Sequence, residues 1–201
     1  MRHQQRNQNE KQERQDTTSS SFSIESFNDF VKTITEEKEH QENPNRIGWD
    51  MYFMELAFLV RRRSPDAQTQ HGAVIVDEDN RLISTGYNGF PPGGPDHLIP
   101  NIRPFKYDFM IHAEVNSILS SKQDLSKCRI YVTGMPCRSC FLHILGSGIK
   151  NIIFGDISYQ ENEKDLFSKA YLYSLYDMHL WKYDKNSGKK NPFFFHRDLR
   201  V

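Results

Sequence analysis

The fold of this chain is decided by residues 112–154, which read HAEVNSILSSKQDLSKCRIYVTGMPCRSCFLHILGSGIKNIIF. Hydrophobic spacing here predicts a helix from about His112, a strand over 129–133, a helix over about 137–145 and a strand over 151–154. Strands that alternate with helices are typical of a sheet covered by helices on both faces. We therefore expect an α/β fold, a three-layer α/β/α sandwich with a central mixed sheet.

The segments on either side extend this pattern. An apolar run over 49–60 that closes on three arginines predicts a helix, because positive charge complements a helix C-terminus. Two apolar runs over 72–76 and 81–85, separated by an acidic turn, predict a hairpin. Farther on, we expect a helix over 164–175 and a strand over 178–183.

Two irregular segments stand out. Residues 88–104 form a long loop rich in proline and glycine, and such a loop inside a compact domain is usually functional. Residues 191–201 form an aromatic and basic tail, whose run Phe193-Phe194-Phe195 is expected to pack on the domain or on a neighbouring subunit.

The N-terminal region differs in composition from the rest of the 201-residue chain. Residues 1–20 hold almost no apolar side chain and are expected to be disordered. Apolar residues recur at near-helical spacing over 22–34, which predicts a short amphipathic helix. We therefore expect a polar, largely disordered extension over 1–45 and one folded domain over 46–201.

Charge and cysteine content narrow the class of protein. Lysine plus arginine equals aspartate plus glutamate, 26 each, which weighs against a dedicated nucleic-acid binder. No apolar run approaches the roughly 20 residues of a membrane span, and the start of the chain lacks a signal-peptide core. A disulfide framework is not expected, because two of the three cysteines form a C-x-x-C pair; Cys128 fits a small half-buried residue beside a strand. We expect a soluble cytoplasmic protein.

Two short motifs supply three metal ligands and a free carboxylate. The first is His112-Ala113-Glu114 and the second is Cys137-Arg138-Ser139-Cys140, preceded by a proline that suits a helix start. An imidazole and two thiolates fit a catalytic Zn²⁺ that keeps its fourth position for water. Residues three apart fall on one face of a helical turn, and the helix dipole favours the thiolate form. The sequence therefore predicts zinc on His112, Cys137 and Cys140.

The spacing of His112 and Glu114 carries a geometric requirement. Residues two apart do not face each other in mid-helix, so this pair converges on one water only at a helix start. Glu114 would then accept the proton of an activated water, pass it to a ring nitrogen and help to release ammonia. The combination H-x-E and P-C-x-x-C is the signature of zinc-dependent nucleobase deaminases.

Other interpretations of the cysteine pair stay open. Alone, it could be half of a structural zinc site or a thiol redox pair. A redox pair does not need His112, and a closed structural site needs a fourth protein ligand, for which His71, His97 and His143 are the candidates. A non-catalytic zinc module that binds a partner is a further alternative, and the intact Glu114 argues against it.

From residue 52 to about residue 159 the sequence resembles the deoxycytidylate (dCMP) deaminases of the cytidine-deaminase-like superfamily. The matching segments are Arg63-Ser64, 70–76 (QHGAVIV), 84–89 (STGYNG), 112–119 (HAEVNSIL), 131–133 (YVT), Cys140 and 147–150 (SGIK). The resemblance implies a cytidine-deaminase-like fold and a zinc-dependent deaminase domain over 46–201. It also implies hydrolysis of dCMP to dUMP and ammonia, which supplies thymidylate synthesis, with Glu114 as the proton shuttle.

The resemblance extends to substrate contacts. It implies that Asn88 holds the deoxyribose or the base and that the main chain at Ala113 contacts the pyrimidine. Arg63, Ser64 and Tyr159 are candidates for binding the phosphate. From the residues alone, Asn88 also fits a turn position, and Arg63 also fits a helix cap.

The resemblance further implies a homo-oligomer and regulation by dCTP and dTTP through a nucleotide with Mg²⁺ near the G-Y-N-G segment. The following loop, residues 92–96, departs from the family pattern, and His71 stands where the family usually has valine, which could shift substrate preference. Alternatives are a deaminase of dCTP or of a modified dCMP, and a polynucleotide-editing deaminase, against which the balanced charge argues.

Overall fold

The computed structural model describes residues 23–36, 43–94, 96–158 and 161–195. The chain divides into two compact units, Met1–Arg46 and Ile47–Val201. The first holds α2 (Ile24–Glu36), which covers most of the helix expected over 22–34, whereas the disorder expected for 1–20 falls outside the described residues. None of the helices in the described part of the chain has the length and apolar character that crossing a bilayer requires.

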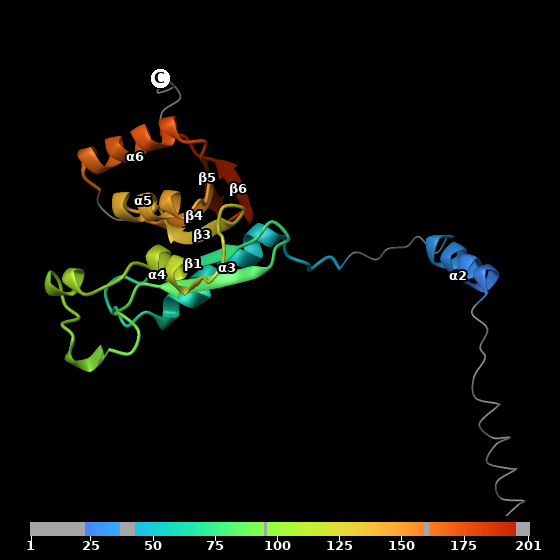
Figure 1. Cartoon of the computed structure of the whole chain (residues 1–201), viewed down its shortest axis with the longest axis horizontal. Coiled ribbons are helices and arrows are strands. Elements are labelled where there is room, and N and C mark those ends of the chain that lie inside the picture. The colour runs from blue at the N-terminus through green and yellow to red at the C-terminus, as the bar shows by residue number, and fades with distance from the viewer. Residues whose placement is uncertain (1–22, 37–42, 95, 159–160, 196–201) are drawn as a thin grey trace, which may run out of the picture. The chain divides into compact units, whose positions relative to one another are not determined.

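The second unit is built on one six-stranded sheet with the order β2-β1-β3-β4-β5-β6 (Figure 1). The parallel pairs are β3 with β4 and β4 with β5, while β1 runs antiparallel to β2 and β3, and β6 runs antiparallel to β5. The predicted mixed sheet is therefore confirmed. The strands are β1 (Gly72–Val76), β2 (Leu82–Tyr87), β3 (Arg129–Gly134), β4 (Asn151–Ile157), β5 (His179–Asp184) and β6 (Lys189–Pro192).

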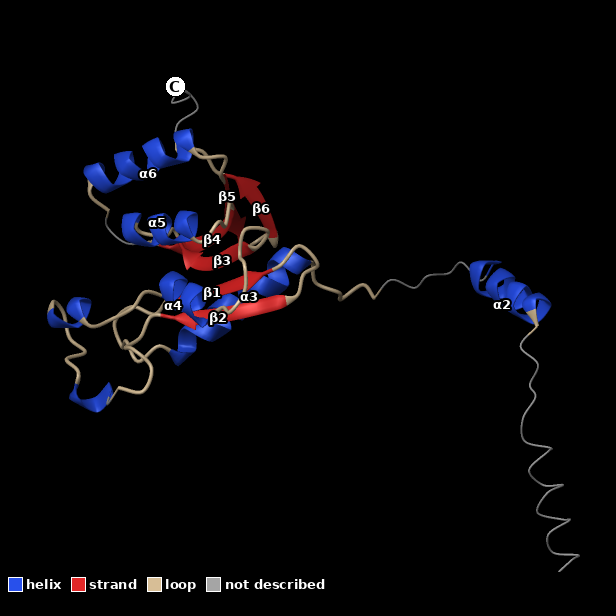
Figure 2. Ribbon diagram, viewed as in Figure 1, coloured by secondary structure: helices blue, strands red, loops and turns tan. Residues whose placement is uncertain are grey.

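Helices cover both faces of the sheet (Figure 2). One face packs on α3 (Trp49–Val60), and the other packs on α4 (Ala113–Ser120), α5 (Arg138–Gly146) and α6 (Glu163–Leu175). The division follows the alternation of β1, all of which is buried: Val74 and Val76 join the cluster with α3, whereas Ala73 and Ile75 join the cluster with α4 and α5. The expected three-layer sandwich is confirmed.

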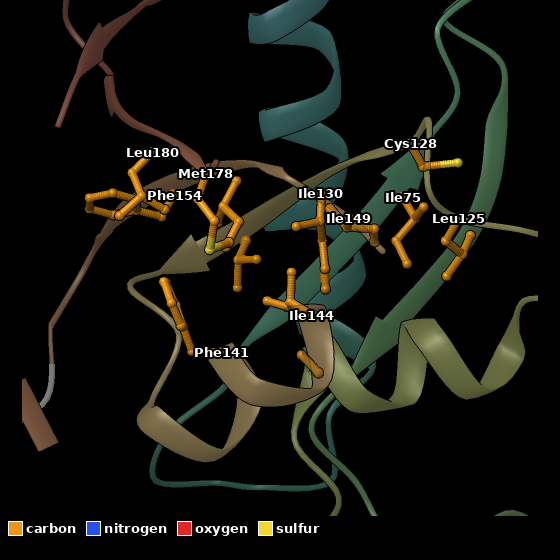
Figure 3. Packing of buried hydrophobic residues seen from close by; sticks show 14 residues of the cluster. Ile75, Leu125, Cys128, Ile130, Phe141, Ile144, Ile149, Phe154, Met178 and Leu180 are labelled. Atoms are coloured by element: carbon orange, nitrogen blue, oxygen red, sulfur yellow. The ribbon is translucent and has the colours of Figure 1, made fainter. Parts of the chain in front are cut away.

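The larger core lies between the sheet and α5. In Figure 3, Phe141 and Ile144 on α5 point toward the sheet, and Ile130 of β3 belongs to the same cluster. Full burial of side chains of this size contributes about 1.5–3 kcal/mol each to folding. Cys128 is 3% exposed in the same cluster just before β3, so it is more deeply buried than expected. It is not part of the group that Cys137 and Cys140 form with His112.

The C-terminal segment contains a strand that the sequence pattern does not predict. Lys189–Pro192 forms β6 because its backbone pairs with β5 at the sheet edge, although its side chains show no apolar alternation. Phe193 and Phe195 then pack against the larger core, with an edge-to-face contact of 5.1 Å between the ring centroids of Phe193 and Phe154. The tail therefore packs on its own domain as far as residue 195, and residues 196–201 lie outside the described part.

The ends of four strands lie together at one end of the sheet. Gly72, the first residue of β1, pairs with Tyr87, the last residue of β2, and Gly134 of β3 pairs with Ile157 of β4. The carboxyl ends of β2, β3 and β4 thus meet the amino end of β1. The residues that adjoin these ends all line one cavity: His71, Asn88, Met135 and Ser158.

Candidate active site

His112 and Glu114 converge at the start of α4. His112 is the N-cap residue in an extended conformation (φ −70°, ψ 156°), and Glu114 lies in the first turn. Both residues line the cavity, as their placement at a helix start requires. Gly86 of β2 permits this arrangement, because a side chain there would collide with the carbonyl oxygen of Ala113.

Cys137 and Cys140 occupy the corresponding positions at the start of α5. Cys137 is the N-cap residue with an extended backbone (φ −67°, ψ 166°), and Cys140 is buried within the first turn. The Nδ1 atom of His112 lies 3.5 Å from Sγ of Cys137 and 3.3 Å from Sγ of Cys140. The three ligand atoms lie within 4.8 Å of one another, so one imidazole nitrogen and two sulfurs could hold a single ion such as Zn²⁺.

The electrostatics of this cluster suit metal binding and proton transfer. The Cys140 thiol donates a hydrogen bond to Cys137, and together with the hydrogen bond from His112 this outweighs burial and lowers the pKa of Cys137 to about 3. Burial raises the pKa of Glu114 above its ordinary value. The site thus holds a thiolate, the form that a metal ion binds, beside a carboxyl group whose proton is held more tightly than in water.

The cluster forms part of the wall of a cavity of about 570 Å³, a volume in the range of small-molecule sites. The wall combines the ligand cluster with polar and charged side chains from the loops around this end of the sheet. It is formed by Asp66, Thr69, His71, Asn88, Arg103, Lys106, Tyr107, Met110, His112, Glu114, Met135, Cys137 and Ser158.

Residues 47–156, more than half of the chain, match the family described as the cytidine and deoxycytidylate deaminase zinc-binding region. The chain belongs to this family. The deoxycytidylate deaminase of Mus musculus is 39% identical over 125 residues, which cover 59% of this chain and 70% of the relative. The Homo sapiens deoxycytidylate deaminase is 37% identical with the same coverage. The resemblance to the dCMP deaminases is thereby confirmed.

A solved structure agrees with the fold of this deaminase. The dCMP deaminase of the cyanophage S-TIM5, crystallised with dCMP and dUMP, superposes with a TM-score of 0.51 at 20% identity. The superposition covers 65% of this chain and 93% of the phage protein. At this identity the similarity supports the cytidine-deaminase-like fold alone.

Asn88 of the deaminase is buried at the cavity wall, and its amide is held by two loop segments. Its Oδ1 accepts a hydrogen bond from the backbone N–H of His71 at 2.7 Å. Its Nδ2 donates to the carbonyl oxygen of Thr69 at 2.8 Å and lies 3.3 Å from the sulfur of Met110. The side chain therefore has a fixed orientation beside the cavity.

The residues expected to bind phosphate are placed differently. Arg63 is exposed in a 3₁₀ turn, and neither it nor Ser64 lines the cavity. The Ser64 hydroxyl is buried and donates to the carbonyl oxygen of Asn88 at 2.6 Å, so it supports the loop. Tyr159 lies outside the described residues, although its neighbour Ser158 lines the cavity.

The sequence patterns did not predict three charged residues of the cavity wall. Lys106 and Asp66 form an ion pair of 2.6 Å that is almost fully buried, and Arg103 donates to the Thr69 hydroxyl at 2.7 Å. These contacts span 34 to 40 positions in the sequence, so no local spacing reveals them. The available signal is weak: Lys106 stands between two aromatic residues, Phe105 and Tyr107, just after the loop over 88–104 that is expected to be functional.

Of the three histidines considered as a fourth ligand, none joins the cluster within the described residues. His71 lines the cavity, but its Nδ1 lies 3.3 Å from the hydroxyl of Thr133, and burial lowers its pKa. Nδ1 of His143 lies 2.7 Å from the carbonyl oxygen of Ser139, and His97 is exposed in the short 3₁₀ helix Asp96–Leu98. The cluster thus offers three protein ligands, the number typical of a catalytic zinc site.

Proposed function

We propose that this chain hydrolyses dCMP to dUMP and ammonia, and so supplies dUMP for thymidylate synthesis, with the activity in residues 46–201. The observation that carries the proposal is the convergence of His112, Cys137 and Cys140 on one point, beside a cavity that His112, Cys137 and Glu114 line. The relatives named deoxycytidylate deaminase support dCMP as the substrate.

The proposed metal ligands are Nδ1 of His112 and the sulfurs of Cys137 and Cys140. A donor set of one nitrogen and two sulfurs matches the preference of zinc for imidazole and thiolate. Bound Zn²⁺ would supply a Lewis acid that lowers the pKa of a coordinated water to about 7. With three ligands from the chain, the fourth coordination position of the ion would stay open for water.

Glu114 is the proposed proton shuttle. Its carboxylate would take a proton from the attacking water and deliver it to the ring nitrogen next to the amino-bearing carbon. That carbon then becomes more electrophilic and would accept the hydroxide. Glu114 would carry a second proton from the added hydroxyl to the amino group, so that the carbon–nitrogen bond breaks and ammonia leaves as the carbonyl forms. The burial that raises the pKa of Glu114 favours this exchange, because a shuttle must hold and release a proton with similar ease.

A nucleotide substrate also needs a partner for its phosphate. Lys106 is already neutralised by Asp66, whereas Arg103 has no carboxylate within ion-pair distance among the described residues. We therefore assign Arg103 to the phosphate, held in place by the Thr69 hydroxyl. The contacts of Asn88 with the deoxyribose or base and of Ala113 with the pyrimidine remain predictions, as do phosphate roles for Arg63, Ser64 and Tyr159.

Assembly, regulation and location complete the proposal. Large apolar side chains are exposed on the loop beside the cavity, which supports a homo-oligomer: Leu98, Ile102, Phe105, Tyr107 and Phe109. Regulation by dCTP and dTTP with Mg²⁺ rests on the G-Y-N-G segment of the family. A cytoplasmic location fits the three free thiols.

One assay tests the function. Ammonia release is measured with dCMP, dCTP, CMP, deoxycytidine and single-stranded DNA, each with and without dCTP or dTTP as effector. We expect dCMP to be turned over with the highest kcat/KM. Turnover of dCTP instead would favour the alternative substrate, turnover of the polynucleotide would favour an editing enzyme, and inactivity on every mononucleotide would defeat the proposal.

A further inference from the structure

Lys169 on α6 is a fully buried lysine that reaches the cysteine-bearing turn. Its side chain has no exposed surface, and its Nζ donates to the carbonyl oxygen of Pro136 at 3.0 Å. Glu161 supplies the countercharge at 2.7 Å, and the ring of Phe195 lies 5.8 Å from the ammonium. The acceptor belongs to the residue directly before the N-cap Cys137.

Burial of an ammonium group is costly, and an ion pair rarely repays the lost hydration. A buried pair is therefore weak evidence for a role in stability and better evidence for fixing one arrangement of the chain. The carbonyl of Pro136 and the N–H of Cys137 belong to one planar peptide unit. A donor that fixes the oxygen of Pro136 also fixes the plane from which Cys137 projects.

A second contact ties the same helix to the same turn. Asp165 of α6 accepts from Nε of Arg138 at 2.8 Å, and Arg138 lies between the two cysteines. Asp165 is itself held by Asn162, the N-cap of α6, whose side chain accepts from the Asp165 backbone N–H. Both contacts come from α6, which lies beyond the residues that match the family, 47–156.

We propose that α6 acts as a clasp, because it holds the turn over 136–140, which carries Cys137 and Cys140, in one arrangement. Lys169 is the positioning residue that sets the orientation of Cys137 for metal binding. This inference rests on the proposed function, because it takes Cys137 as a zinc ligand. Lys169 touches neither the metal nor the substrate; it acts through the Pro136 carbonyl, as groups outside the ligand shell do in other metal sites.

The test is the zinc affinity of the folded full-length protein, measured by competition with a chromophoric chelator and independent of activity. K169M removes the ammonium but keeps a side chain of similar length. We expect K169M to bind zinc about 10- to 100-fold more weakly than the wild type and to lose zinc faster to excess chelator. The matched control is K164M, the same change at an exposed position of α6, which should leave zinc affinity unchanged.

Two further variants separate positioning from general destabilisation. E161Q/K169M removes the carboxylate together with its partner, so it should recover thermal stability relative to K169M while zinc affinity stays low. L172A removes a partly buried apolar side chain of α6 without touching Pro136, and it should lower the Tm while keeping zinc affinity.

The outcomes distinguish the two proposals. If the wild type binds zinc and K169M binds it equally well, the clasp is wrong and the proposed function stands. If L172A weakens zinc binding as much as K169M at a matched loss of Tm, Lys169 is merely structural and the inference is again overturned. If the wild type binds no zinc, the proposed function fails first and the clasp falls with it.

Discussion

The ammonium of Lys106 and the carboxylate of Asp66 lie 2.6 Å apart, and both side chains are almost completely buried at the cavity wall. The pair joins the long loop after β2 to the segment before β1, 40 residues away in the sequence. Arg103 and Asn101 make further contacts between the same two segments. This side of the cavity is therefore held by tertiary contacts between irregular segments and the short 3₁₀ helix Phe105–Asp108, which carries Lys106.

Removal of one partner of this pair should be more harmful than removal of both. K106M leaves an unpaired buried carboxylate, and such changes cost about 3–5 kcal/mol in the free energy of unfolding. The double variant D66N/K106M should recover most of that loss. Urea unfolding of the three proteins measures the difference, and a double variant no more stable than K106M would contradict the expectation.

The same carboxylate predicts a dependence of stability on pH. Burial alone would raise the pKa of Asp66, but hydrogen bonds from Lys106 and from the backbone of Gln68 and Thr69 hold it below the ordinary 3.8. A lowered folded-state pKa gives stability that is present above about pH 4 and is lost as the pH falls through the folded value. Unfolding curves from pH 6 to pH 2 should show D66N losing less stability than the wild type below pH 4.

Replacement of Glu114 should separate proton transfer from metal binding. E114Q keeps the size of the side chain but cannot shuttle a proton, so kcat for dCMP should fall by about 10²–10⁴-fold. Zinc content, measured by atomic emission, should stay near one ion per chain. A variant that loses its zinc would show that Glu114 also supports the metal, and full activity would exclude it as the shuttle.

Cys137 and Cys128 should behave differently when each is changed to serine. C137S removes a proposed ligand, so zinc content and activity should both fall, and added Zn²⁺ should restore little of either. C128S provides the matched control, because Cys128 is buried in the core away from the cluster. It should lower the Tm modestly and leave zinc content intact; loss of zinc from C128S would contradict the proposed ligand set.

Replacement of Arg103 should weaken the binding of a nucleotide and leave the reaction with a nucleoside nearly unchanged. R103M removes a charge-assisted hydrogen bond to phosphate, worth about 1.5–3 kcal/mol, so KM for dCMP should rise about 10- to 100-fold. The rate with deoxycytidine, which has no phosphate, should change little. R63M is the comparison variant at one of the candidate positions named from the sequence. A larger effect of R63M than of R103M would show that Arg63, not Arg103, binds the phosphate.

Local sequence patterns predict most of the elements and the ligand cluster, because both arise from short spacings. The H-x-E and C-x-x-C motifs lie at helix starts, where backbone conformation is set within one turn. Charged residues such as Asp66, Lys106 and Lys169 could not be placed, since their partners are far away in the sequence and their burial reverses the usual tendency of charged side chains. The edge strand β6 was missed because pairing with β5, rather than side-chain pattern, makes it a strand.

The gathering of four strand ends at one end of the sheet has a consequence for protein engineering. The connections at the opposite end of the strands are residues 77–81, 121–128 and 147–150, and none of these residues lines the cavity. The cavity thus lies at one end of the strands, and the turns at their other end take no part in its wall. A peptide tag or a labelled cysteine placed in the hairpin turn at 77–81 should therefore report on the protein while leaving its chemistry undisturbed.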